Sequence, residues 1–232
     1  VNFIPAQVPP DPTQPKKFII PIQQYTWELR YSCTQNGQWQ PESSYVIDAW
    51  TKTIPSPVKS MHFSAPAITT TLDSVHIFME KTSYAQSVIG WRWEWQLCYY
   101  SFPKGQPELL NYAVIDYAYE YYPPPPQPIP ESLVIISDPS CVSDKYGNIH
   151  IAYALKSEIK YIKKTGDSFS DAEVISGIGI YDQPSIGINY DEITVVWAGN
   201  PMPGPGTQIR CRRKFINSTF WGNIERIDKG DN

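Results

Sequence analysis

This 232-residue sequence lacks three features that would place it in other protein classes. No run of 18 apolar residues occurs, so no transmembrane helix is expected. No segment of helical length shows a 3.6-residue apolar period, which argues against a helical bundle. The formal net charge is −4, so a broad nucleic-acid-binding surface, which needs clustered Lys and Arg, is not expected either.

Metal-binding and catalytic signatures are also missing. The cysteines form no CxxC or CxxCH pair, so neither a structural zinc site nor an attached haem is supported. Their spacing allows three disulfide pairings and favours none, and ordinary buried thiols are the alternative. His76 and His150 occupy the same position in two repeats, which indicates packing rather than metal binding. No Ser-His-Asp, GxSxG or phosphate-binding glycine signature occurs, so we assign no catalytic residue, metal or cofactor.

What the sequence has in abundance is proline and aromatic residues. It contains 23 Pro, 16 Tyr and 8 Trp. Proline breaks helices, and aromatic side chains suit the surfaces of β-sheets. The hydrophobic fraction of 41% is enough for a sizeable core, and the charged fraction of 18% is too low for a disordered chain. We therefore predict an all-β domain over residues 16–228, preceded by a proline-rich extension over residues 1–15.

A unit of about 45 residues recurs along this domain. The two clearest copies each begin with a proline, Pro139 or Pro184. Each copy contains four short runs of alternating apolar residues separated by Gly, Asn, Asp or Pro, which is typical of four antiparallel strands. The predicted copies occupy residues 16–48, 66–120, 139–183 and 184–228.

Such units predict a β-propeller, in which four-stranded antiparallel blades are arranged around a central channel. A double-sheet sandwich is the alternative, although sandwiches rarely repeat at this period. The D-x-x-G-N turn at 144–148 and the Ile-Lys-Tyr of residues 159–161 resemble secreted β-propellers of the sialidase-like (BNR-type) and lectin groups. The resemblance covers roughly residues 15–228. It implies a propeller fold and a location outside the cell or at the cell surface.

About four blades are recognisable, and six to eight are more usual in a propeller. We therefore expect a closed four-bladed ring, a part of a larger propeller, or a ring completed by a protein partner or by self-assembly. An open ring would expose sheet faces and edge strands unless another element covered them.

The longer connections fall on one end of the predicted blades. When strands are followed from the centre outwards, the first and third turns of each blade are short and lie at the opposite end. We expect the end with long connections to carry the binding site, because loops on a rigid scaffold carry most functional residues. The alternative is that these loops only cover an irregular ring. The long connections are predicted at 48–65, 80–92, 116–138 and 198–207.

Two aromatic segments near that end contain the candidate binding residues. Residues 91–95 alternate Trp with charge, so the Trp side chains lie on one side of a strand and Arg92 and Glu94 on the other. Residues 112–122 carry five tyrosines and precede four consecutive prolines. Aromatic rings beside Arg and Glu can stack on a sugar and hydrogen-bond its hydroxyls. The predicted ligand-binding residues are Trp91, Arg92, Glu94, Tyr119, Tyr121 and Tyr122.

Both segments also have a purely structural interpretation. Trp93 and Trp95 can pack between neighbouring blades, and the Tyr and Pro segment can form a rigid connection. Four carboxylates near the long connections permit an enzymatic hypothesis, since two convergent carboxylates suit acid–base catalysis. Solvated loop carboxylates are the alternative. These residues are Asp48, Asp116, Glu120 and Asp182.

The sequence therefore favours a non-enzymatic extracellular propeller that binds a partner subunit or a carbohydrate, or that has a structural role. A sialidase-like or lyase-like glycan-processing enzyme is the alternative. The sialidase turn S-x-D-x-G-x-x-W does not occur in the sequence.

Overall fold

The computed structural model describes residues 23–35, 38–39, 45–54, 61–63, 66–87, 90–122, 136–201 and 206–228. Every regular element within these ranges is a β-strand, so the predicted all-β class is confirmed. No helix among them is long and apolar enough to cross a membrane. The predicted proline-rich extension lies outside the described residues.

The described strands form four successive antiparallel sheets, which we call the first to fourth sheets, and one further short pair of strands. The first sheet pairs β1 (Gln23–Tyr31) with β4 (Tyr45–Ile54), and β2 (Thr34–Gln35) pairs with β3 (Gln38–Trp39) between them. The second sheet contains β5 (Met61–Phe63), β6 (Ala67–Thr70), β7 (Ser74–Ser87), β8 (Gly90–Pro103) and β9 (Asn111–Tyr122). The third contains β10 (Ile136–Ser143), β11 (Ile149–Leu155), β12 (Glu158–Thr165), β13 (Ser168–Phe169) and β14 (Glu173–Val174). The fourth contains β15 (Gly179–Asn189), β16 (Glu192–Pro201), β17 (Gln208–Phe215) and β18 (Glu225–Arg226).

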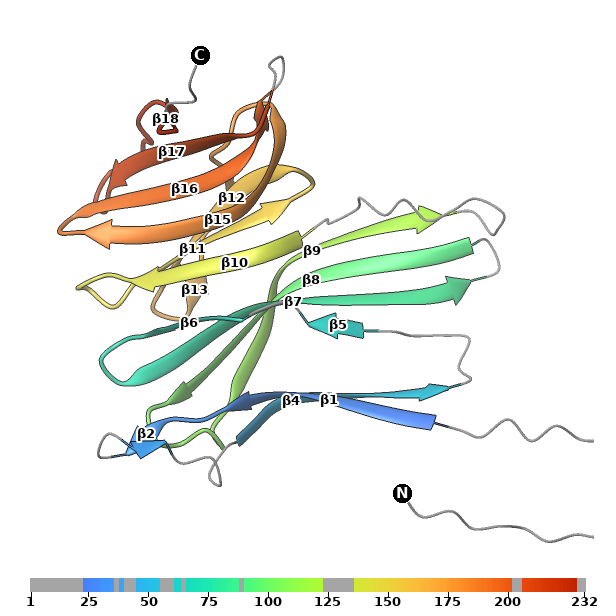
Figure 1. Cartoon of the computed structure of the whole chain (residues 1–232). Helices are drawn as coiled ribbons and strands as arrows, with labels where there is room; N and C mark the ends of the chain where they lie inside the picture. Colours follow the sequence, from blue (N-terminus) through green and yellow to red (C-terminus); the bar gives the residue numbers. More distant parts are fainter. Residues whose placement is uncertain are drawn as a thin grey trace, which may run out of the picture.

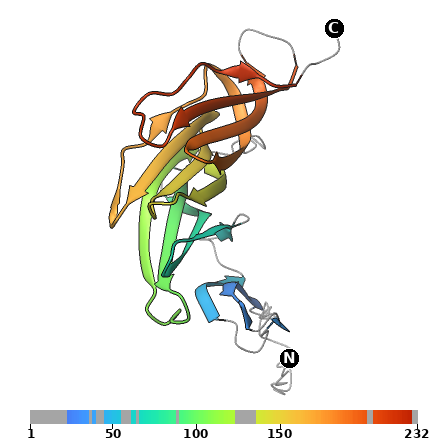
Figure 2. The ribbon, with the colours of Figure 1, turned by 90° about the vertical axis from the view of Figure 1, so that its left-hand side faces the viewer.

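The sheets follow one another in chain order as a row (Figure 1). Figure 2 shows the same row from the side, with the first and fourth sheets at its two ends. One strand from each of the last three sheets lies at their common edge, with β6 beside β10 and β10 beside β15. A cavity of about 390 Å³ lies between them and is lined by Pro66, Pro139 and Pro184, the prolines that open the sequence repeats.

Each interface between neighbouring sheets has its own apolar cluster. One cluster joins Ile47 of the first sheet to the second, another joins Trp95 of the second to the third, and another joins Ile159 of the third to the fourth. Strand β11 is therefore covered on both faces, and all seven of its residues are buried. This double burial explains why its sequence is almost continuously apolar rather than alternating.

A repeated bulge places a carboxylate at two of these interfaces. The last long strands of the first and second sheets each contain an extra residue, Ile47 or Ile115, just before an aspartate. Such a bulge redirects the side chains that follow it. Asp48 and Asp116, two of the carboxylates considered for catalysis, consequently reach the following sheet.

Asp48 and Asp116 each bind a buried tyrosine and a lysine of the sheet that follows. Oδ2 of Asp48 accepts a hydrogen bond from Tyr100 at 2.7 Å and lies 3.1 Å from Nζ of Lys81. Oδ2 of Asp116 accepts a hydrogen bond from Tyr153 at 2.6 Å and lies 3.7 Å from Lys160. We call these two arrangements the aspartate latches.

The predicted connection at 80–92 is different in the structure. Residues 81–87 pair with residues 90–96 throughout, so most of this segment is a long two-stranded arm rather than a loop. Strand β9 extends the arm, because Trp91 to Leu97 also pair with Tyr122 to Asp116. The β-favouring aromatic residues of this segment account for its strand conformation.

Replacing Tyr153 with Phe tests the second aspartate latch. The substitution removes the hydroxyl that binds Asp116 and keeps the ring in the apolar cluster. Because hydrogen bonds to charged groups contribute more than neutral ones, we expect a loss of about 1.5–3 kcal/mol in the free energy of unfolding. Urea denaturation measures this change, and Tyr190→Phe, at a side chain that is 91% exposed, is the control. Equal unfolding midpoints for both variants would contradict a stabilising latch.

Candidate functional site

Four of the six predicted ligand-binding residues lie together on one face of the β8–β9 pair. Arg92 is directly opposite Tyr121, and Glu94 is directly opposite Tyr119. In an antiparallel pair, opposite residues point to the same face, and residues two apart share that face. We call Arg92, Glu94, Tyr119 and Tyr121 the arginine–tyrosine patch.

The side chains of the arginine–tyrosine patch contact one another. An Arg92 guanidinium nitrogen lies 2.7 Å from a carboxylate oxygen of Glu94. Cζ of Arg92 lies 5.1 Å from the ring centre of Tyr119 and 5.8 Å from that of Tyr121, within the range of cation–π attraction. The two tyrosine rings are 5.9 Å apart and nearly perpendicular. About half of each tyrosine remains exposed.

Trp93 and Trp95, on the other face of β8, pack at the interface between the second and third sheets. Trp95 is 3% exposed and belongs to the cluster between the second and third sheets. Trp93 stacks on it with a ring-centre distance of 5.9 Å. Trp91 and Tyr122 pair through their backbones at the end of the arm, and their side chains lie outside the described residues.

A second candidate site is a cavity of about 640 Å³ between the second and third sheets. It lies among the short turns, at the end opposite to the predicted one, and sequence reasoning did not find it. Backbone and hydroxyl groups, carboxylates and the rings of Tyr99 and Tyr146 line it. The repeated histidine position and the D-x-x-G-N turn, which were interpreted as packing and as a propeller feature, are the sequence signals that could have indicated this region.

His76 forms part of the wall of this cavity and is almost fully buried. Its Nδ1 lies 2.8 Å from the hydroxyl of Tyr99, and its Nε2 lies 3.1 Å from the hydroxyl of Thr71. Burial, together with the nearby Lys164, lowers the pKa of His76 to about 4, and Asp73 partly opposes this shift. His76 is therefore neutral at neutral pH, with both ring nitrogens engaged by hydroxyls.

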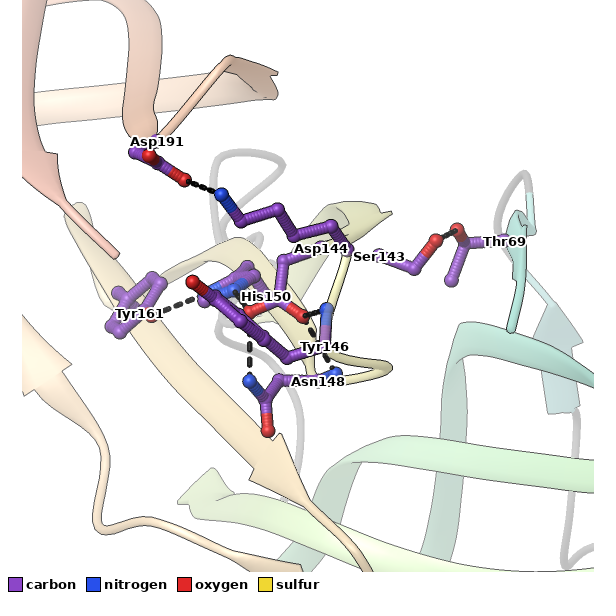
Figure 3. A network of polar contacts seen from close by, with 9 residues as sticks. Thr69, Ser143, Asp144, Tyr146, Asn148, His150, Tyr161 and Asp191 are labelled. Carbon is purple, nitrogen blue, oxygen red and sulfur yellow. Dashed lines mark hydrogen bonds and ion pairs between the residues drawn. The ribbon is translucent and has the colours of Figure 1, made fainter. Parts of the chain in front are cut away.

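The equivalent His150 lies in a network formed around Asp144 (Figure 3). Oδ1 of Asp144 accepts hydrogen bonds from the backbone nitrogens of Tyr146 and Asn148, at 2.8 and 2.9 Å. Oδ2 accepts from the Asn148 amide at 2.7 Å and lies 3.1 Å from His150. Nδ1 of His150 lies 2.6 Å from the hydroxyl of Tyr161, repeating the pair that His76 forms with Tyr99.

This network shapes the turn and leaves Asp144 little capacity as a base. Burial raises its pKa, but the hydrogen bonds from Asn148, His150 and the turn backbone outweigh burial and hold the pKa below its usual range. A carboxylate with a lowered pKa and both oxygens occupied is a weak proton acceptor. The cavity therefore has polar walls suited to binding, without a poised acid–base pair at Asp144.

The other carboxylates considered for catalysis have separate partners. Asp48 and Asp116 form the aspartate latches, and Glu120 lies 3.8 Å from Lys156. Asp182 is an exposed residue of β15. In the part of the chain that the structure describes, no group of three or more His, Cys, Asp or Glu is arranged to hold a metal. The four cysteines are free thiols.

No family model and no curated protein matches the sequence. The arrangement of residues described above is therefore the basis for the function proposed below.

The buried neutral His76 makes the stability of the protein depend on pH. Its pKa in the folded state, about 4, is below the ordinary value of 6.5. As the pH falls, the unfolded chain therefore binds a proton at a higher pH than the folded protein does. The full free energy of unfolding is present above pH 6.5, and part of it is lost as the pH falls towards 4. This loss is on the order of 3 kcal/mol for such a difference in pKa.

Replacing His76 with Gln removes the titrating group and keeps a side chain able to bond Tyr99. We expect the free energy of unfolding of the His76→Gln variant to fall less steeply between pH 6.5 and 4 than that of the unaltered protein. Urea titrations at several pH values measure the two slopes. Parallel slopes would show that His76 does not titrate in this range.

Proposed function

We propose that this chain is a non-enzymatic, extracellular β-propeller protein that binds neutral carbohydrate through the arginine–tyrosine patch. The observation that carries the proposal is the convergence of Arg92, Glu94, Tyr119 and Tyr121 on one exposed strand face. These residue types supply the two requirements of sugar recognition, apolar ring surface and fixed hydrogen-bonding groups.

The propeller part of the proposal is supported by the arrangement of β6, β10 and β15. Strand β6 lies beside β10 and β10 beside β15, as the innermost strands of propeller blades do around a channel. Side-chain hydrogen bonds join them: the hydroxyl of Ser143 donates to the carbonyl of Thr70, and Ser140 accepts from the backbone nitrogen of Ile186. A sandwich of two facing sheets accounts less well for a row of sheets in which the inner ones are covered on both sides.

A neutral ligand fits the charge balance of the patch. Glu94 neutralises Arg92 at 2.7 Å, so the patch offers donors and acceptors without an excess of positive charge. An anionic glycan would need an arginine that is not already paired with a carboxylate. The partly exposed rings of Tyr119 and Tyr121 are available for the apolar face of a sugar.

Asp48, Asp116 and Asp144 give little support to a glycan-processing enzyme. Such an enzyme requires two convergent carboxylates, one of them with a raised pKa. Asp48 and Asp116 bind tyrosines across sheet interfaces, and Asp144 has a lowered pKa. Binding without catalysis needs none of these groups to transfer a proton.

A glycan array of the purified chain tests the proposed function. We expect reproducible binding to neutral glycans, and we expect Tyr119→Ala and Tyr121→Ala to weaken that binding by about tenfold or more each, because each removes ring surface from the contact. Titration calorimetry with the best glycan measures the change in affinity.

The control is Tyr190→Ala, which removes a more exposed tyrosine from the β15–β16 turn, outside the arginine–tyrosine patch. It should leave glycan binding unchanged, and all three variants should melt at nearly the same temperature. Failure of the folded protein to bind any neutral glycan, or equal losses in all three variants, would refute the proposal.

A further inference from the structure

The outer face of the fourth sheet repeats the pattern of faces that are buried elsewhere in the molecule. Leu97 and Ile159 hold equivalent positions in the second and third sheets and are fully buried under the next sheet, whereas Ile209 holds this position in the fourth sheet and is 43% exposed. Ile175 is likewise fully buried, and its equivalent Ile227 is 46% exposed. The equivalence is fixed by matching backbone hydrogen bonds, from Ile175 to Ile159 and from Ile227 to Ile209.

Strand β16 continues this apolar face. Val196 alternates with the buried Val195 and Trp197, so it points away from the third sheet. Val196 pairs with Cys211 as Ala152 pairs with Tyr161, and Ala152 is fully buried beneath the fourth sheet. In the third sheet, the same arrangement of apolar residues is covered by the fourth sheet. Its recurrence on the outer face of the fourth sheet indicates that this face also packs against a sheet.

The charge on this face also follows the repeat. Asp228 holds the position that Asp48 and Asp116 hold in the first and second sheets, directly after the repeated isoleucine. Those two aspartates bind a tyrosine and a lysine of the following sheet. Asp228 instead binds Arg226 of its own segment at 3.0 Å, and its side chain is 24% exposed.

The outer face of the first sheet carries an arginine, Arg30, at the matching position, where it forms an ion pair with Glu28 at 2.6 Å. Leu29 points towards the second sheet, so the neighbouring Arg30 points away from it, and its side chain is 50% exposed. Arg30 holds the position of Lys160, whose ammonium nitrogen lies 3.7 Å from Asp116. Lys160 of the third sheet reaches Asp116 of the preceding second sheet. If a first sheet followed the fourth sheet, its Arg30 would lie in the same way beside Asp228.

We infer that a second copy of this chain docks the outer face of its first sheet on the outer face of the fourth sheet, with its Arg30 beside Asp228. The contact is head to tail, because it joins two different faces of the same molecule. The contact places the first sheet of one copy next to the fourth sheet of the other, as neighbouring blades lie in a propeller. The inference depends on the register of the sheets and not on the carbohydrate proposal.

Light scattering after size-exclusion chromatography of the full chain tests the docking. We expect a species of twice 26.5 kDa that dissociates on dilution. Asp228→Arg should place two like charges at the contact and raise the dissociation constant by about tenfold or more. Arg30→Asp should do the same, and the variant that combines both exchanges should recover association, because the opposite charges then meet again.

The matched control is Asp171→Arg, an equal change of charge at an exposed residue between β13 and β14. It should leave association unchanged. A longer polymer that is dissolved by Asp228→Arg would support the same contact in a geometry that does not close. A monomer at every concentration, or association that ignores both single exchanges, would overturn the inference. Glycan binding by Asp228→Arg separates this outcome from the carbohydrate proposal.

Discussion

The structure depends on the burial of each sheet between two neighbours. The inner sheets are covered on both faces, and each interface is filled by one apolar cluster. Burial of apolar surface supplies most of the favourable free energy of folding, so a sheet covered on one face only contributes less. The first and fourth sheets, at the two ends of the row, each have one outer face that no described sheet covers. The equivalent faces of the inner sheets are buried.

Polar groups at the interfaces give the stacking its specificity. An apolar face alone tolerates sliding, whereas a hydroxyl bound to a carboxylate requires one alignment of the two sheets. The two aspartate latches are arrangements of this kind, whereas the His76–Tyr99 and His150–Tyr161 pairs join neighbouring strands within one sheet. In the first latch the lysine comes from β7 and the tyrosine from β8, whereas in the second the tyrosine comes from β11 and the lysine from β12. The same chemistry therefore recurs although the two strands have exchanged roles.

Much of the local structure followed from alternation and turn chemistry. The strand at 149–155, the turn at 144–148 and the shared face of Arg92 and Glu94 were all predictable, because side chains alternate along a strand. Residues 80–92 and 116–122 were predicted to belong to long connections, whereas most of them form paired strands of the arm. The cavity around His76 was not found, because its walls come from turns of two sheets that are distant in sequence.

The sequence by itself determined the class of structure and the contents of each unit. Proline and aromatic residues exclude long helices, and strand periodicity follows from geometry within a few residues. Only the tertiary structure decided which carboxylates are consumed by structural contacts. Asp48 and Asp116 are indistinguishable from catalytic acids in a list of residues, and they become latches because a bulge turns them towards Tyr100 and Tyr153 of the next sheet. Such contacts join residues about forty to fifty positions apart, and no local pattern encodes that distance.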